Sequence, residues 1–167
     1  YSAIEACSDL LEGYGGHKHA AGLSMKPENV EKFKEQFEAY VSENITEENL
    51  IPTINIDAEI RLRDVHKKLF NVLSRFKPFG PGNMRPVFLT KDVKDIEWSK
   101  KVGANQEHLK IDINEKNNSY RYSGICFNQA SAYDIVKSGN EFNVCYIIDE
   151  NTYKGRTNIQ LRVKDIQ

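Results

Sequence analysis

The second half of the chain has the polar–apolar pattern of β-strands. Beyond Pro52, apolar residues occupy every second position from Ile54 to Leu62, which predicts a half-buried strand. Similar runs predict strands over residues 87–98, 107–113, 119–127, 142–149 and 156–165, with turn signals at 103–105 and 116–118. A short helix over residues 129–137 is predicted between the third and fourth of these five strands. That order is typical of an OB-fold barrel, a fold that commonly binds single-stranded nucleic acid.

Helical spacing dominates the first part of the chain. Ile4, Cys7 and Leu11 share one face of residues 2–12, and Gly13 follows them, which predicts a helix that ends there. Pro27 suits the first position of a second helix, because its fixed φ is already helical. An apolar stripe with charged residues between its members then predicts an amphipathic helix.

Two further segments connect these regions. Residues 42–52 have the composition of a linker or domain edge. After the first predicted strand, Asp64 is the expected N-cap of a helix that ends before Pro78. The predicted buried face of this helix consists of Val65, Leu69, Val72, Leu73 and Phe76.

Composition narrows the class of protein. The chain has 167 residues, 40% hydrophobic and 28% charged, as in ordinary globular domains. It contains no apolar run of about 18 residues, so we expect no transmembrane helix. It begins without Met and without signal-peptide features, so we expect a piece of a longer protein. Its 3 cysteines are widely spaced and form no CxxC pair, which favours buried thiols over a disulfide framework or a zinc site.

Charge is unevenly distributed along the chain. Residues 1–52 contain 4 Lys/Arg and 10 Asp/Glu, whereas residues 53–167 contain 19 and 14, so the net charge of −1 is the sum of −6 and +5. This asymmetry indicates two units, the second better suited to a polyanion. A solvated surface of mixed charge would give the same counts.

A glycine–histidine segment is the first candidate for chemistry. Gly15 and Gly16 precede His17, so exposed backbone N–H groups and an imidazole could face an anion together. A structural turn with a surface histidine explains the same spacing. His17 and His19 would point the same way in a strand, but no third metal ligand lies nearby in the sequence, so we expect no metal there.

Longer strings resemble one family over nearly the whole chain. GGHKHAAG at residues 15–22 resembles the GGHxxAAG signature of DHHA1 domains, the substrate-binding partners of DHH-family phosphoesterases. KPFGPGNMRPVF at residues 77–88 resembles the PFGPGNPEPVF segment of RecJ-type exonucleases, with Met84 and Arg85 in place of Pro-Glu. HLK at 108–110, ICFN at 125–128, YKGR at 153–156 and QL at 160–161 resemble stretches of the RecJ OB domain. GGHxxAAG alone is shared by several DHHA1 proteins, but its combination with the other strings is specific.

The resemblance implies an α+β fold with two parts. Residues 1–50 would be the C-terminal part of a small α/β DHHA1 domain. Residues 53–167 would be a mostly β RecJ-type OB-fold domain, with a strand–helix lead-in over 53–86 and the barrel over 87–167. The implied function is that of the substrate-binding part of a single-stranded-DNA-specific 5′→3′ exonuclease in DNA repair and recombination.

The implied catalytic arrangement places the metals elsewhere. In the family a separate DHH domain binds Mn²⁺ or Mg²⁺, and no Asp-His-His string occurs in this chain. We therefore expect no cofactor here, and no hydrolysis by these 167 residues alone. By resemblance, His17 would be catalytic, facing the metals and contacting the scissile or terminal phosphate, while Gly15 and Gly16 would give it access.

The OB part should supply a basic groove and flat side chains for stacking. Its candidate DNA-binding residues are Lys110, Arg121, Tyr122, Tyr153, Lys154 and Arg156. Phe127 could also supply a stacking face, but its expected place is the barrel core. Trp98 suits core or platform equally, and residues 79–83 are expected to brace strand layers and not to contact DNA. The implied partners are single-stranded DNA, single-strand-binding protein and a RecQ-like helicase in the bacterial cytoplasm, with no membrane.

Two alternatives remain at this point. A freestanding OB-fold module would bind single strands without any enzyme, although it would not need the GGHxxAAG string. Another DHHA1 phosphoesterase, such as an oligoribonuclease or a cyclic-dinucleotide phosphodiesterase, would share that string, but the PFGPGN segment and the OB-like tail argue against it.

Overall fold

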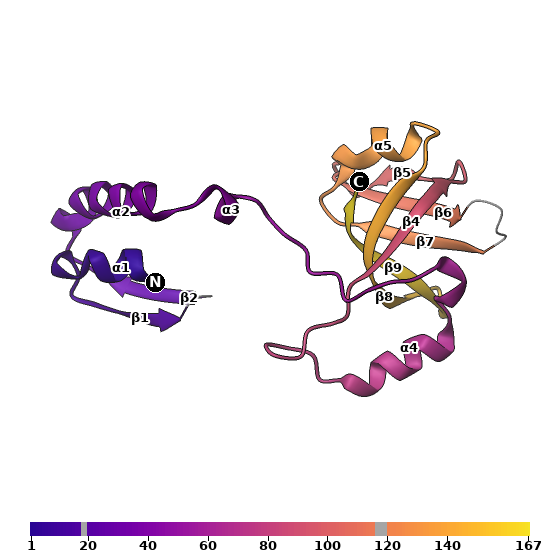
Figure 1. The fold of residues 1–167 in the computed structure, drawn as a ribbon, viewed down its shortest axis with the longest axis horizontal. Helices are drawn as coiled ribbons and strands as arrows, with labels where there is room; N and C mark the ends of the chain where they lie inside the picture. Colours follow the sequence, from indigo (N-terminus) through magenta and orange to yellow (C-terminus); the bar gives the residue numbers. More distant parts are fainter. Residues whose placement is uncertain (18–19, 116–119) are drawn as a thin grey trace. The chain divides into compact units, whose positions relative to one another are not determined.

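The computed structural model describes residues 1–17, 20–115 and 120–167. These residues divide into two compact parts, Tyr1–Thr53 (the N-terminal unit) and Ile54–Gln167 (the barrel unit). Figure 1 shows the elements of each. The turn predicted at 116–118 lies outside the described residues.

The N-terminal unit combines short helices with a β-hairpin. Its elements are α1 (Ser2–Ala6), the 3₁₀ turn η1 (Ser8–Leu10), β1 (Gly13–His17), β2 (Ala20–Ser24), the 3₁₀ turn η2 (Pro27–Asn29), α2 (Val30–Asn44) and α3 (Glu47–Leu50). The prediction of one helix over 2–12 was wrong, because Cys7 leaves helical geometry and Leu11 is extended. Pro27 does begin the helical segment that continues into α2, as predicted. The hairpin was not predicted, because its glycines and alanines give no apolar alternation.

Side-chain amides join the α2 region to the helical turns at the start of this unit, Gln36 of α2 to α1 and Asn29 of η2 to η1. Gln36 donates a hydrogen bond to the carbonyl of Ala6 (2.8 Å), and Asn29 donates one to the carbonyl of Leu10 (3.0 Å). Cys7 is fully buried beside them, whereas both strands of the hairpin are exposed along their length.

The barrel unit is mostly β. Its elements are β3 (Ala58–Glu59), η3 (Leu62–Asp64), α4 (Lys67–Leu73), η4 (Ser74–Phe76), β4 (Phe88–Asp95), β5 (Lys100–Val102), β6 (His108–Glu115), β7 (Arg121–Cys126), η5 (Ala130–Ala132), α5 (Tyr133–Lys137), β8 (Phe142–Tyr153) and β9 (Arg156–Ile166). The five strands predicted between residues 87 and 165 and the helix over 129–137 are all confirmed, while the edge strand β5 was missed.

Five of the described strands close into a ring. The sheet order is β3-β4-β8-β9-β7-β6-β5, and an additional pairing of β4 with β6 joins the sheet to itself. In the closing pair, Lys94 lies opposite Asn114. β7 and β9 are parallel, while the other ring pairs are antiparallel. Ring closure leaves few unpaired edges and encloses one core.

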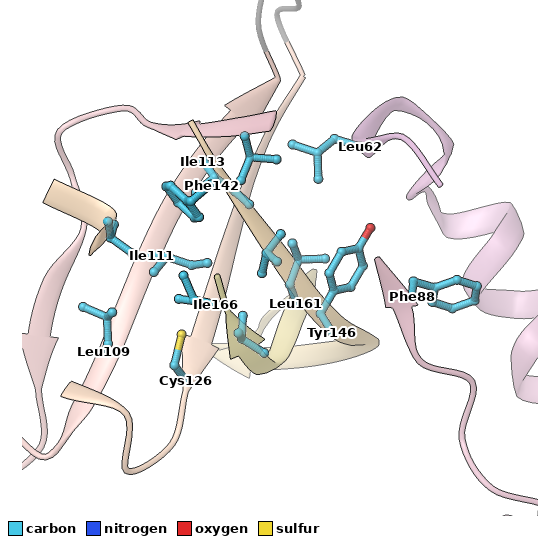
Figure 2. Packing of buried hydrophobic residues seen from close by; sticks show 14 of the residues in the cluster. Leu62, Phe88, Leu109, Ile111, Ile113, Cys126, Phe142, Tyr146, Leu161 and Ile166 are labelled. Atoms are coloured by element: carbon cyan, nitrogen blue, oxygen red, sulfur yellow. The ribbon is translucent and has the colours of Figure 1, made fainter. Parts of the chain in front are cut away.

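The core fills this strand ring. Figure 2 shows labelled side chains from β6, β8 and β9, among them Ile111, Tyr146 and Leu161, converging inside it. Apolar and polar positions alternate along β6, whose Leu109, Ile111 and Ile113 are fully buried.

The lead-in differs most from its prediction. Alternation predicted a strand over 54–62, but only Ala58 and Glu59 pair with β4, in parallel, and Ile54 and Ile56 are exposed. A β-strand needs a neighbouring strand for its backbone hydrogen bonds. Because β4 begins only at Phe88, residues 54–56 have no part of β4 to pair with.

The helix of the lead-in also begins later than predicted. Asp64 lies in the η3 turn, and the N-cap of α4 is His66, whose Nδ1 accepts a hydrogen bond from the Leu69 N–H (3.1 Å). Val65 is buried and Leu69 and Leu73 pack against the core, but the predicted burial of Val72 and Phe76 was wrong, since both are exposed.

The PFGPGN segment is held by its asparagine. The Asn83 amide donates to the carbonyls of Phe76 (2.7 Å) and Pro78 (2.8 Å), and the backbones of Gly80 and Asn83 exchange two hydrogen bonds of 2.9 Å. Arg85 pairs with Asp149 of β8 at 3.1 Å. The hydrogen bonds hold the loop to itself, and Arg85 attaches it to β8. The expected brace between strand layers by residues 79–83 stays a prediction.

Candidate nucleic-acid interface

An open groove runs along the outside of the barrel unit. We call it the β6–β7 groove. It is lined by His66, Lys67, Val102, Lys110, Arg121, Tyr122, Ser123, Ile125, Phe127, Asn151, Tyr153, Asn158, Ile159 and Gln160. The start of α4, strands β5, β6 and β7, and the β8–β9 hairpin contribute to it.

Strand alternation sends charged side chains into this groove. Leu109 and Ile111 of β6 point into the core, so Lys110 between them points outward. Lys110 lies opposite Ile125 of β7, and Asn114 lies opposite Arg121. Neighbouring strands thus bring Lys110 and Arg121 to one outer surface.

Four of the six predicted DNA-binding residues line the groove together. They are Lys110, Arg121, Tyr122 and Tyr153. Lys154 lies in the turn between β8 and β9, and Arg156 is the first residue of β9; neither is among the lining residues. Lys154 adopts a positive φ of 49° and lies 5.5 Å from the centre of the Tyr153 ring, so its charge stays beside that aromatic face.

Phe127 contradicts the expectation that it lies in the barrel core. Its side chain is 48% exposed and lines the groove, because it follows Cys126, which takes the inward position at the end of β7. The His108 ring meets it edge-on at 5.2 Å, and the Arg162 guanidinium lies 5.4 Å from its centre. Ile125, Cys126 and Phe127 are three consecutive apolar residues, so the pattern of polar and apolar positions carries no signal for which of them faces outward.

The tyrosines of the groove differ in exposure. Tyr153 is 68% exposed, as a stacking face requires. Tyr122 is half-buried against the core, and this burial, followed by the proximity of Tyr120, raises the pKa of its phenol. Tyr122 therefore presents only part of its ring to the groove.

Sequence reasoning missed two residues at the rim. His66 and Lys67 line the groove because α4 begins there, two residues after the position that was predicted to cap it. The imidazole of His66 uses Nδ1 for the cap, which leaves Nε2 as its donor when neutral. Trp98 is 74% exposed, so it is not a core residue, and it does not line the groove, so it is not a stacking platform there.

The glycine–histidine segment lies in the N-terminal unit. Gly16 has a φ of 137°, and a Cβ there would lie 2.3 Å from the carbonyl oxygen of Ala20, so the pairing of β1 with β2 requires glycine. A Cβ on Gly15 would meet nothing within 4 Å. His17 ends β1 and its residue is exposed. His19 lies outside the described residues.

The described residues contain no ligand set for the metals that the resemblance implies. Across residues 1–17, 20–115 and 120–167, no group of three His, Cys, Asp or Glu side chains could hold a metal ion. All three cysteines are unpaired and buried, and burial raises the pKa of the Cys126 thiol to about 12. We derive no metal-dependent step from these residues. Among the described helices none is long and apolar enough to cross a membrane.

The ring and its groove define the class of protein: a small β-barrel domain with an open, partly basic groove on its outer surface. The family model described as the RecJ OB domain matches residues 56–165. The chain therefore belongs to the RecJ OB domain family.

Relatives match beyond the barrel. The single-stranded-DNA-specific exonuclease RecJ of Bacillus subtilis (strain 168) is 27% identical over 165 residues, which are 99% of this chain and 21% of that protein. The RecJ of Thermus thermophilus is 26% identical over 99% of this chain and 22% of its own length. The chain thus spans about a fifth of these relatives.

A solved structure shows the same fold. The crystal structure of RecJ in complex with Mn²⁺ from Thermus thermophilus superposes with a TM-score of 0.69 at 23% identity, covering 99% of this chain and 23% of that one. A second crystal structure of the same protein, in complex with Mg²⁺, gives the same TM-score.

Proposed function

We propose that this chain is the substrate-binding C-terminal part of a single-stranded-DNA-specific 5′→3′ exonuclease that acts in DNA repair and recombination. The observation that carries the proposal is the β6–β7 groove, where Lys110 and Arg121 lie with the exposed aromatic residues Phe127 and Tyr153. Cations for the phosphates and flat rings for the bases are what a sequence-tolerant single-strand site needs. The names of the relatives support the same substrate.

The N-terminal unit supports the enzymatic half of the proposal. Residues 1–50 would be part of a DHHA1 domain, and residues 15–17 and 20–22 of the GGHKHAAG string lie in the paired strands β1 and β2. His17 would contact the scissile or terminal phosphate, with Gly15 leaving open space beside it. The metals, Mn²⁺ or Mg²⁺, would be bound by a separate domain of the parent enzyme. The chain alone would then bind DNA without cleaving it.

The partners and location follow from the same proposal. Single-strand-binding protein and a RecQ-like helicase would supply the single strands in the bacterial cytoplasm. These assignments extend the proposed substrate and are tested separately from it.

Binding by the 167-residue chain is the direct test. Fluorescence anisotropy with a labelled oligothymidylate of about 15 nucleotides, in EDTA, should show binding at low salt that weakens as salt rises. Arg121→Gln should weaken binding and reduce the slope of log K against log [salt] by about 0.7, because one phosphate contact is lost. Lys91→Gln, on β4 and not a groove residue, is the matched control and should leave the slope unchanged.

The enzymatic half needs the longer parent protein. With Mn²⁺ and a 5′-phosphorylated single strand, His17→Ala should lower the cleavage rate while the anisotropy titration of the groove is unchanged. Equal cleavage rates for the parent protein and the His17→Ala variant would show that His17 has no role in catalysis. Absence of any binding to the oligonucleotide at low salt would refute the groove as a DNA site.

A further inference from the structure

The cations of the groove are not equally available to a ligand. Lys67, Lys110 and Arg121 line it. Lys67 forms an ion pair with Glu150 of β8, and Lys110 Nζ lies 3.5 Å from Asp112 Oδ2. Arg121 forms no ion pair with any residue that the structure describes. Each groove lysine therefore already has an anionic partner.

The Asp112 carboxylate is the fixed member of its pair. Its side chain is 16% exposed, against 39% for that of Lys110. The Ser123 hydroxyl, directly across the β6–β7 ladder, donates a hydrogen bond to its Oδ1. Oδ2 remains for Lys110, so the lysine can move to another anion while the carboxylate stays beneath it.

The Glu150 pair has the same asymmetry. The side chain of Glu150 is 29% exposed and stands on β8, whereas that of Lys67 is 60% exposed on the first residue of α4. Both ammonium groups remain in contact with solvent, which screens these ion pairs and keeps them weak, so the lysines exchange partners readily. A phosphate that recruits either lysine must displace a carboxylate and then remain near its negative charge.

We propose that Glu150 and Asp112 compete with DNA phosphates for Lys67 and Lys110, and so lower the affinity of the groove for single-stranded DNA. The inference rests on the proposed single-strand binding and deepens it, because it names residues that oppose binding. A chain that must let a strand advance after each cleavage gains from contacts that break easily. The two carboxylates supply that property without removing the cations that attract the strand.

Removing each charge while keeping its shape tests the competition. Glu150→Gln and Asp112→Asn should each tighten binding of the oligothymidylate about two- to fivefold at low salt, the range set by an exposed ion pair. Each should also steepen the slope of log K against log [salt], by up to about 0.7, as a freed lysine engages one more phosphate. The amide oxygen introduced by Asp112→Asn would still accept the hydrogen bond from Ser123, so the β6–β7 ladder is preserved.

A matched control separates local competition from net charge. Glu59 pairs with Lys91 at 2.7 Å on exposed side chains, and neither residue lines the groove. Glu59→Gln changes the net charge by the same amount, and it should alter affinity by less than the groove variants do. In a Lys67→Ala background, Glu150→Gln should lose most of its effect, since its competitor is gone.

The outcomes distinguish this inference from the proposed function. If the wild-type chain binds and the groove variants bind no more tightly than Glu59→Gln, the competition is refuted while the DNA site stands. If the wild type binds and the Glu150→Gln, Asp112→Asn double variant binds more tightly than Glu59→Gln, the competition is upheld together with the DNA site. If neither binds, both proposals fall.

Discussion

The Tyr146 phenol and the Thr90 hydroxyl lie 2.8 Å apart inside the strand ring, and both side chains are almost wholly buried. Thr90 also donates its hydroxyl hydrogen to the carbonyl of Ile60 at 2.8 Å. A hydroxyl has one hydrogen to give, so Tyr146 must be the donor to Thr90. Burial raises the pKa of Tyr146, which keeps this donor protonated. The chain of two hydrogen bonds connects β8 through β4 to the lead-in.

Tyr146→Phe should therefore destabilise the barrel unit by about 1–3 kcal/mol, because Thr90 loses a buried donor while the ring volume is kept. Thr90→Val should cost more, since it leaves both the Ile60 carbonyl and the Tyr146 hydroxyl unpaired. Urea unfolding monitored by circular dichroism measures both changes. Equal stability of Tyr146→Phe and wild type would show that the bond contributes nothing net.

Asp95 should make stability depend on acidity. Burial alone would raise the pKa of Asp95, but hydrogen bonds from Lys137 Nζ (2.7 Å) and from Ser99 outweigh it and hold the pKa below its usual range. A carboxyl with a lowered folded-state pKa stabilises the fold above its unfolded pKa of about 3.9, and this contribution is lost as pH falls through the folded value.

Asp95→Asn should accordingly lower the free energy of unfolding by about 1.5–3 kcal/mol at pH 7, the range for hydrogen bonds to a charged group. The difference from wild type should shrink as the pH falls below about 4. Denaturant titrations at pH values of about 7, 4 and 3 compare the two chains on either side of that unfolded pKa. A difference that stays constant across this range would exclude the ionisation of Asp95 as its source.

Asn83 should be the residue on which the PFGPGN loop depends. Asn83→Ala removes hydrogen bonds to the carbonyls of Phe76 and Pro78 and should cost about 1–2 kcal/mol. Hydrogen exchange over residues 77–86 should rise at the same time. The neighbouring Met84 is 74% exposed, so Met84→Ala should change stability by less than about 0.5 kcal/mol and serves as the comparison.

Phe127 should contribute base stacking to the groove. Phe127→Leu keeps an apolar side chain but removes the aromatic face, and should weaken oligothymidylate binding by about 1–3 kcal/mol. An abasic oligonucleotide of equal length should bind both chains alike, since it has no base to stack. Trp98→Ala, which removes a more exposed aromatic residue away from the groove, should leave affinity unchanged. Loss of affinity for both oligonucleotides with Phe127→Leu would indicate structural damage and refute stacking.

The sequence by itself determined the elements whose burial is one-sided. Alternation along β6 and the spacing within residues 129–137 predicted those elements correctly, because a segment with one face in the core shows its period in its own residues. The sequence strings around Gly16 and Asn83 also indicated the family. Each string fixes a backbone conformation that few residue types allow, so the residues themselves carry the information.

Tertiary structure decided which strands form and which side chains meet, because both depend on contacts between distant parts of the chain. The alternation of residues 54–62 yields a strand only at Ala58 and Glu59, where β4 offers its edge. Closure of the ring brings Lys67 and Tyr153 into one groove with Arg121, although they are far apart in the chain. It also pairs Lys67 with Glu150. Such pairings arise from the order of the strands and the packing of α4 beside them, which the local pattern of polar and apolar residues does not encode.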